Sequence, residues 1–354
     1  LVSAEGVAVA FSDTWAYAPG GKVVLESKLG DVRLESGALV SVSANAAGGD
    51  AGQVSLLAET GTVSAAAGTL RGTAVEDAEQ GELRVDAATL DVNQLVMAAR
   101  ESAASGATVN HFGGLWDLRR RSGDLLLTDS VQARQVRFAT DDGDIRIGTA
   151  TTTGKIDASG AKGGEIELYA NHGNVVLGER GQLLARAEEV VENLSNAGTR
   201  GRGGRVTLGA SGVDGKVVTL AGSLIDVGVA EGSAAQGGKI IFRADAPTDF
   251  ADIASRDDLN IQLAGVIQGA ASVNAELVSH YTGNSLIAGA SSGMTLGLSS
   301  IKTDLDAAYS TENMATLRAY LGFNEAIHHV TPGVEIATPT GLNDFSIDAD
   351  LDLM

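Results

Sequence analysis

The stretch Gly163-Gly164-Glu165-Ile166-Glu167-Leu168 decides the fold, because two glycines are followed by alternating apolar residues. The same phrase returns at residues 203–208 and 237–242 and, nearer the start, at residues 20–25. Alternation with a period of two is typical of strands, and paired glycines mark turns. A repeated strand-and-turn unit buries its apolar face by stacking on its neighbours, so the sequence predicts an elongated all-β solenoid.

Short strands and tight turns also fill the sequence between the glycine pairs. Residues 175–177 and 183–185 follow residues 166–169, with turns of glycine and asparagine between them. Hairpins are the competing interpretation, since Gly-Asp and Gly-Asn turns favour them as well. We favour coils, because equivalent strands recur every third strand and each strand is too short for a stable meander. The predicted coil has roughly 20 residues, with glycines stacked where φ is positive.

Composition limits the possible partners. The 354 residues carry a net charge of −20 and include 46 glycines and no cysteine. Strong acidity argues against nucleic acid as a partner, because phosphate binding needs clustered Lys and Arg. The absence of cysteine excludes disulfides and thiolate metal sites. No apolar run reaches the roughly 18 residues of a membrane-spanning helix, so we expect no transmembrane segment and no cofactor.

We expect residues 1–354 to form one repeat domain with two helical insertions. Residues 183–197 place apolar side chains at helical spacing, opposite three glutamates. Residues 303–329 show the same spacing, with Ser310 or Thr311 as a possible cap and Gly322 as the end of the helix. The chain starts inside strand-like sequence, without an initiator Met or a signal-like segment, and we interpret it as a fragment of a longer protein.

The repeats resemble those of filamentous haemagglutinin-type exoproteins, the large adhesins of two-partner secretion. The resemblance is carried by Gly154-Lys155-Ile156-Asp157-Ala158-Ser159-Gly160 followed by Gly163-Gly164-Glu165-Ile166-Glu167-Leu168-Tyr169-Ala170, and it covers residues 20–60 and 120–245 best. It implies a right-handed parallel β-helix and export through an outer-membrane transporter. It also implies an extracellular location at the outer-membrane surface, with a role in adhesion, biofilm formation or contact-dependent competition.

One departure from that family limits what can be transferred. The secretion domain of these exoproteins carries an Asn-Pro-Asn type motif, and this chain has no Asn-Pro. The expected function is therefore a structural and adhesive shaft segment, with glycans or a cell-surface receptor as possible partners. We expect no enzyme, and the alternative is a polysaccharide lyase or hydrolase on a β-helix scaffold.

Asp141, Asp142 and Asp144 crowd one turn and are the candidate metal ligands. Clustered carboxylates bind Ca²⁺ or serve as an acid/base pair. Aspartate beside glycine is also ordinary turn chemistry, which is the interpretation we favour.

Arg119, Arg120 and Arg121 form the main basic run, with Trp116 close by in sequence. These four residues are the candidate binding residues, because together they could hold an anionic glycan or a lipid head group. In an acidic protein the arginines also have many carboxylates to pair with, and we favour that interpretation.

Overall fold

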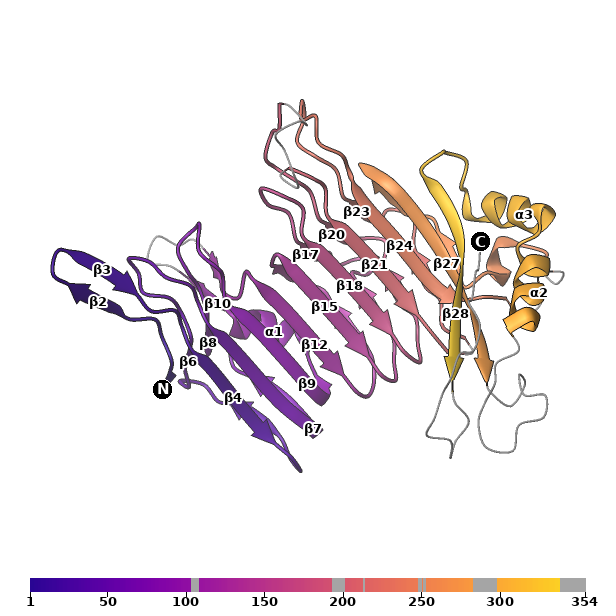
Figure 1. Cartoon of the computed structure of the whole chain (residues 1–354). Helices are drawn as coiled ribbons and strands as arrows, with labels where there is room; N and C mark the ends of the chain where they lie inside the picture. The colour runs from indigo at the N-terminus through magenta and orange to yellow at the C-terminus, as the bar shows by residue number, and fades with distance from the viewer. Residues whose placement is uncertain are drawn as a thin grey trace.

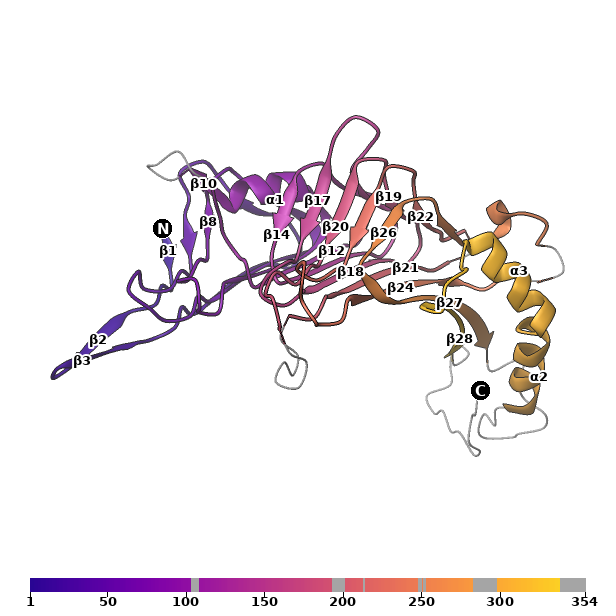
Figure 2. The same cartoon turned by 90° about the horizontal axis from the view of Figure 1, so that it is seen from above.

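The computed structural model describes residues 1–102, 108–192, 201–212, 214–247, 250, 253–282 and 298–337. These residues form an all-β, solenoid-like stack of parallel strands drawn out along one axis (Figure 1), which confirms the predicted fold class at this level. Seen from above, a β-hairpin projects at the N-terminal end and two helices lie at the other end (Figure 2). None of the helices in the described ranges has the length and apolar run needed to span a bilayer.

Three sheets build the body of the stack. The long sheet has eleven parallel strands within the described residues, and β5 (Val32–Leu34) pairs beside β7 in it. The other ten follow in chain order: β4 (Lys22–Ser27), β7 (Gln53–Ala65), β9 (Glu82–Leu90), β12 (Leu115–Arg120), β15 (Gln135–Thr140), β18 (Glu165–Ala170), β21 (Arg205–Ala210), β24 (Gly238–Asp245), β27 (Ala270–Thr282) and β28 (His328–Ala337). The second sheet contains β13 (Leu125–Leu127), β16 (Ile145–Ile147), β19 (Val175–Leu177), β22 (Val217–Thr219) and β25 (Ile261–Leu263). The third sheet contains β14 (Ser130–Gln132), β17 (Gly154–Asp157), β20 (Gly181–Leu184), β23 (Leu224–Asp226) and β26 (Val266–Gln268).

Smaller elements lie around the N-terminal coils. A short parallel sheet joins β1 (Val2–Ser3), β6 (Val40–Ser41) and β8 (Leu70–Arg71), and β5 (Val32–Leu34) pairs with the far part of β7. Antiparallel pairs are formed by β2 (Ala8–Phe11) with β3 (Thr14–Tyr17), and by β10 (Arg100–Ser102) with β11 (Thr108–Asn110). Helix α1 spans Val92–Ala98, and a 3₁₀ turn spans Arg256–Asp258.

From β12 to β26 each repeat contributes one strand to each of the three sheets, so equivalent strands recur every third strand there, as predicted. Among the described residues, the long-sheet strands before β12 and after β26 have no partners in the second and third sheets. The predicted coil length of 20 residues is wrong for most coils. Leu115 pairs with Gln135, 20 positions on, but Gln135 pairs with Glu165 and Glu165 with Arg205, at spacings of 30 and 40. The loops between strands absorb the difference, because a loop that projects from the stack leaves the register unchanged.

The core lies between the sheets and is built from columns of stacked side chains. One column contains Trp116, Val136, Ile166, Val206 and Ile240, and the next contains Leu118, Phe138, Leu168, Leu208 and Phe242. All of these side chains are buried. The inward positions alternate with exposed or half-buried ones along each strand, which is the period-two pattern that the sequence carries.

The glycine pairs lie where the third sheet passes into the long sheet, a position here called the glycine corner. A Cβ atom on Gly164 would lie 2.0 Å from the carbonyl oxygen of Arg134, and one on Gly204 would lie 2.2 Å from that of Gly164. Neither glycine has a positive φ, so the predicted reason for them is wrong. They are required because adjacent coils approach too closely for any side chain.

The predicted helix at residues 183–197 is wrong for the part that the structure describes. Residues 183 and 184 belong to β20, and Ala187 forms parallel bridges to Gly160 and Val229. The backbone N–H of Ala187 donates to Gly228 of the next coil, at 3.0 Å. A helix would need those groups for its own hydrogen bonds, so stacking overrides the helical spacing. Residues 193–197 lie outside the described residues.

Helices do occupy much of residues 303–329. Helix α2 spans Leu298–Ala308 and α3 spans Thr311–Leu321. Ser310 caps α3 through its hydroxyl, which accepts from the N–H of Asn313 at 3.4 Å, and Gly322 ends it with a φ of +71°. Residues His328–Ala337 form strand β28 instead. The buried side chains of Leu317 and Leu321 place α3 over the end of the core.

Candidate functional site

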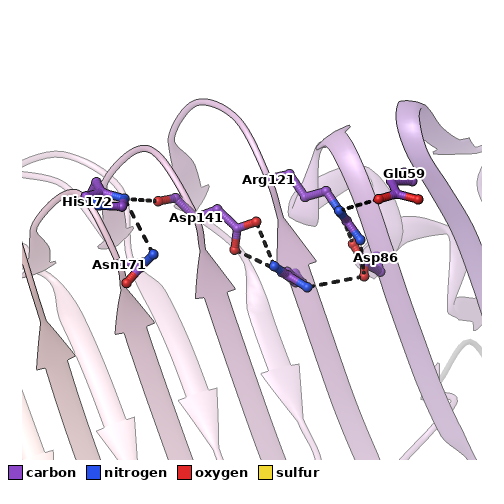
Figure 3. A network of polar contacts seen from close by, with 7 residues as sticks. Glu59, Asp86, Arg121, Asp141, Asn171 and His172 are labelled. Carbon is purple, nitrogen blue, oxygen red and sulfur yellow. Dashed lines mark hydrogen bonds and ion pairs between the residues drawn. The ribbon is translucent and has the colours of Figure 1, made fainter. Parts of the chain in front are cut away.

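The arginine run lies where β12 leaves the long sheet, and two of its side chains bind carboxylates of neighbouring strands (Figure 3). Arg121 donates to both oxygens of Asp86, at 2.7 and 3.0 Å, and to Glu59 at 3.0 Å. Arg119 donates to both oxygens of Asp141, at 2.9 and 2.8 Å. These hydrogen bonds to Asp86 and Asp141 raise the pKa of Arg121 and of Arg119. The two cations are thus already engaged by neighbouring acids.

The same line of contacts continues across further coils. Nδ1 of His172 lies 3.0 Å from the carbonyl oxygen of Asp141 and 3.4 Å from the side-chain amide of Asn171 (Figure 3). The hydroxyl of Ser211 donates to the carbonyl oxygen of Asn171 at 2.6 Å. We call this set the polar ladder: Glu59, Asp86, Arg119, Arg121, Asp141, Asn171, His172 and Ser211. It crosses the stack from β7 to β21 and therefore ties coils together at their rim.

The three candidate metal ligands do not converge. Both oxygens of Asp141 accept from Arg119, and Asp142 is exposed. Oδ1 of Asp144 accepts from the backbone and side-chain N–H groups of Asn174, at 2.7 and 2.9 Å. Across the described ranges, no group of three or more His, Cys, Asp or Glu side chains could hold a metal ion.

Asp144 belongs to a second chain of contacts, at the corner between the long sheet and the second sheet. Its N–H donates to Oδ1 of Asp124 at 2.9 Å, and the N–H of Lys216 donates to Oδ1 of Asn174 at 2.9 Å. Asp124, Asp144 and Asn174 thus repeat one contact, a side-chain oxygen that accepts from the next coil. We call this position the Asx corner, and its chemistry is that of turn stabilisation.

Trp116 is a core residue, so its candidacy as a binding residue is wrong. Its side chain is only 3% exposed and stacks between Leu83 and Val136 of the adjacent strands. An inward indole cannot contact a glycan outside the stack. Arg120 donates to backbone carbonyl groups of Ser122 and Leu90, at 2.7 and 2.8 Å. Its role is local support of the turn.

A separate charged cluster lies near the C-terminal end of the long sheet. Arg243 donates to Glu335 at 2.6 Å and lies 3.9 Å from Glu276. Nε2 of His280 lies 2.8 Å from Asp245, and its Nδ1 lies 3.5 Å from Glu335. Carboxylates, an arginine and a histidine therefore meet on the outward face of three adjacent strands, β24, β27 and β28.

A furrow of about 370 Å³ crosses the glycine corner at β18, β21 and β24. Its floor is bare backbone, because the glycine pairs have no side chains: Gly163, Gly164, Gly203, Gly204, Gly237 and Gly238. One wall carries the first outward side chains of the strands, which the register places in line: Gln135, Glu165, Arg205 and Lys239. The other wall carries the residues that precede the glycine pairs, Lys162, Arg202 and Gln236, and Arg134 lies at one end.

The furrow is basic in an acidic protein. Five basic side chains line it, and Glu165 is the one acidic residue among its lining residues. Arg205 lies 3.8 Å from Glu165. The side chains of the other four, Arg134, Lys162, Arg202 and Lys239, are exposed and make no ion pair or hydrogen bond within the part of the chain that the structure describes.

Sequence reasoning missed the furrow, although a signal was present. Lys162 precedes one glycine pair, Arg202 and Arg205 flank the next, and Lys239 follows the third. Read as a repeat, a basic residue beside each glycine pair indicates a basic row along the solenoid. Considered one turn at a time, each residue has the appearance of ordinary surface charge.

Comparison with known proteins identifies no relative: no family model matches the chain, and neither a curated protein nor a solved structure is significantly similar to it.

Proposed function

We propose that this chain is a structural and adhesive shaft segment of a large secreted bacterial surface exoprotein, built as a right-handed parallel β-helix. The observation that carries the proposal is the unbroken parallel pairing of the long sheet from β4 to β28. Such a stack grows in one dimension and presents long faces rather than one enclosed cleft. Its similarity to filamentous haemagglutinin-type repeats supports the same assignment.

Export and location belong to this proposal. A full-length protein of this kind crosses the outer membrane through a two-partner-secretion transporter and remains at the cell surface or in the medium. A chain without cysteine supports that route, because no disulfide can form before the chain has crossed. Its function would then be attachment to glycans, to a cell-surface receptor or within a biofilm.

Removing one whole coil tests the shaft. Deleting residues 135–164 joins Arg134 to Glu165, which has the same register position as Gln135. We expect a shorter protein that still unfolds cooperatively, because each coil needs only its two neighbours. Deleting residues 135–149 is the matched control, and we expect it to abolish the fold because the remaining strands fall out of phase. Equal damage from both deletions contradicts the proposal.

Adhesion is tested separately, by displaying the wild-type chain on a bacterial surface and counting cells retained on glycan-coated plates. Retention equal to that of undisplayed cells contradicts the adhesive part of the proposal. An experimental structure of the purified chain settles the hand of the coils.

The alternative, a polysaccharide lyase or hydrolase, is favoured by one observation, the cluster of Arg243, His280, Asp245, Glu276 and Glu335. Paired carboxylates beside a cation are the groups that cleave glycosidic bonds. A reducing-sugar assay over a panel of polysaccharides distinguishes the two functions. Product formation that disappears in Glu335→Gln favours the enzyme, and no product favours the shaft.

A further inference from the structure

The furrow at the glycine corner differs in charge from the rest of the surface. The chain has 25 basic and 45 acidic residues, yet five basic residues and one acidic residue line this hollow. Elsewhere on the same sheet the arginines are paired: Arg119 and Arg121 each bind a carboxylate with two hydrogen bonds. The four unpaired cations of the furrow lack the carboxylate partners that arginines have elsewhere. An external anion can therefore form those ion pairs and hydrogen bonds here.

We propose that the furrow binds an acidic polysaccharide that carries a carboxylate on each sugar, lying parallel to the axis of the stack. The proposal deepens the adhesive role stated above and rests on it. Adjacent coils are separated by about 4.8 Å, the spacing of paired strands. One sugar unit extends a glycan chain by a comparable length. Successive coils therefore present cations at the repeat of such a polymer, as Arg205 and Lys239 do, which are register partners on one wall.

The furrow also has the polar groups that a sugar needs besides charge. Arginine binds a carboxylate through two parallel hydrogen bonds, and Arg134, Arg202 and Arg205 supply three such groups. Gln135 and Gln236 lie in the two walls, and their amides can donate to and accept from hydroxyl groups. The floor of glycine backbone lets a flat sugar ring approach closely, without side chains in its path.

Nucleic acid fits the same surface less well. It carries about one phosphate per 3.4 Å of each strand, a denser charge than one per coil. The rest of a chain with net charge −20 repels the more densely charged polymer more strongly. The furrow also has no aromatic side chain among its lining residues on which a base could stack. A polymer with sparser charge and many hydroxyl groups matches the furrow better.

Binding to immobilised polygalacturonate tests the proposal, with the whole chain as the analyte. We expect the wild type to bind, and to bind more weakly as salt rises from 50 to 200 mM, because the contacts are ionic. The double variant Arg202→Gln/Lys239→Gln is expected to bind at least about tenfold more weakly, since each hydrogen bond to a charged group is worth about that factor.

The matched control is Lys22→Gln/Lys28→Gln, which makes the same change in net charge on exposed lysines outside the furrow. It is expected to bind like the wild type. Neutral dextran and a single-stranded oligonucleotide serve as the control polymers. The proposal is overturned if the wild type does not bind polygalacturonate, if the two variants lose affinity equally, or if the oligonucleotide binds more tightly. The coil-deletion experiment does not involve ligand, so failure here leaves the shaft proposal standing.

Discussion

The glycine corner and the Asx corner lie at opposite ends of the long strands, and both contain glycine, but only the Asx corner holds its glycines at a positive φ. At the glycine corner, Gly164 and Gly204 have no positive φ, and their hydrogen atoms face the backbone of the next coil. At the Asx corner, Gly123 and Gly143 have φ values of +79° and +139°. A Cβ atom on Gly143 would also lie 2.5 Å from the backbone of Gly123, and side-chain oxygens tie the coils as well. One corner excludes side chains and leaves a bare surface, whereas the other depends on side chains for its stability.

The largest expected effect comes from adding one methyl group at each corner. Gly204→Ala would place Cβ 2.2 Å from the carbonyl oxygen of Gly164, and we expect a loss of about 3 kcal/mol in the free energy of unfolding. Gly123→Ala meets only the end of the flexible Arg120 side chain, at 2.8 Å, so about 1 kcal/mol of backbone strain is expected. Urea unfolding of both variants measures the difference. A larger loss for Gly123→Ala would reverse the comparison.

The next largest loss of stability is expected from removing a side-chain contact of the Asx corner. Asp144→Ala removes the acceptor for two N–H groups of Asn174, and we expect a loss of about 1–3 kcal/mol. Asp142→Ala, in the same turn, changes an exposed side chain and is expected to cost less than about 0.5 kcal/mol. Thermal unfolding of the pair separates a structural aspartate from a solvated one. Equal losses would show that the turn needs both carboxylates.

A smaller effect is expected at the rim, in the polar ladder. Arg121→Gln removes its ion pairs with Asp86 and Glu59, for an expected loss of up to about 1 kcal/mol. The loss should shrink in 1 M salt, because screening weakens the pairs in the wild type as well. Arg33→Gln is the control, since Arg33 is 63% exposed and pairs with Asp31 at a distant turn. A loss that does not depend on salt would contradict an ionic role for Arg121.

The last prediction concerns a buried histidine beside the glycine corner, where we expect the smallest effect on stability at neutral pH. His111 precedes the pair Gly113-Gly114 and is 4% exposed, with Nε2 3.5 Å from Glu101. Burial lowers the pKa of its imidazole, against the attraction of Glu101 and with the repulsion of Arg71. The unfolded chain therefore binds a proton at His111 at a higher pH than the folded chain does. The contribution of His111 to the free energy of unfolding is complete above about pH 6.5 and is lost as the pH falls below that value.

The variant His111→Gln tests the direction of this pH dependence. Stability should fall less between pH 7.5 and pH 5 in the variant than in the wild type, measured by urea unfolding at both values. Many carboxylates titrate near the lower pH, so the difference between the two proteins is the quantity to compare. An identical decline in both would remove His111 as a cause.

The sequence predicts strands well where burial alone determines them. Ile166 and Leu168 alternate with Glu165 and Glu167, and that pattern places them in the core because no other arrangement buries both. The same rule would have placed Trp116 inside, since it is in phase with Leu118. Nearness in sequence instead linked Trp116 to the arginines, but a strand places Trp116 and Arg119 on opposite faces.

Contacts between residues that lie far apart in the sequence could not be predicted in the same way. Residues 183–197 have helical spacing in the sequence, but in the described part hydrogen bonds to the next coil decide the conformation. Those partners lie about 40 residues away, as Ala187 and Gly228 do. The furrow depends on register as well. Lys162, Arg202 and Lys239 form one basic surface only after stacking brings their coils together.

Helix α3 has a consequence for how long such a column can become. A stack of parallel strands is a template at each open end, and another chain could extend it. Leu317 and Leu321 of α3 close one end of the apolar interior, and Pro332 in the outermost strand β28 offers no N–H to a newcomer. We expect these two features to disfavour the addition of another chain along β28. We then expect the length of the column to depend on the number of stacked coils and not on the concentration of the protein.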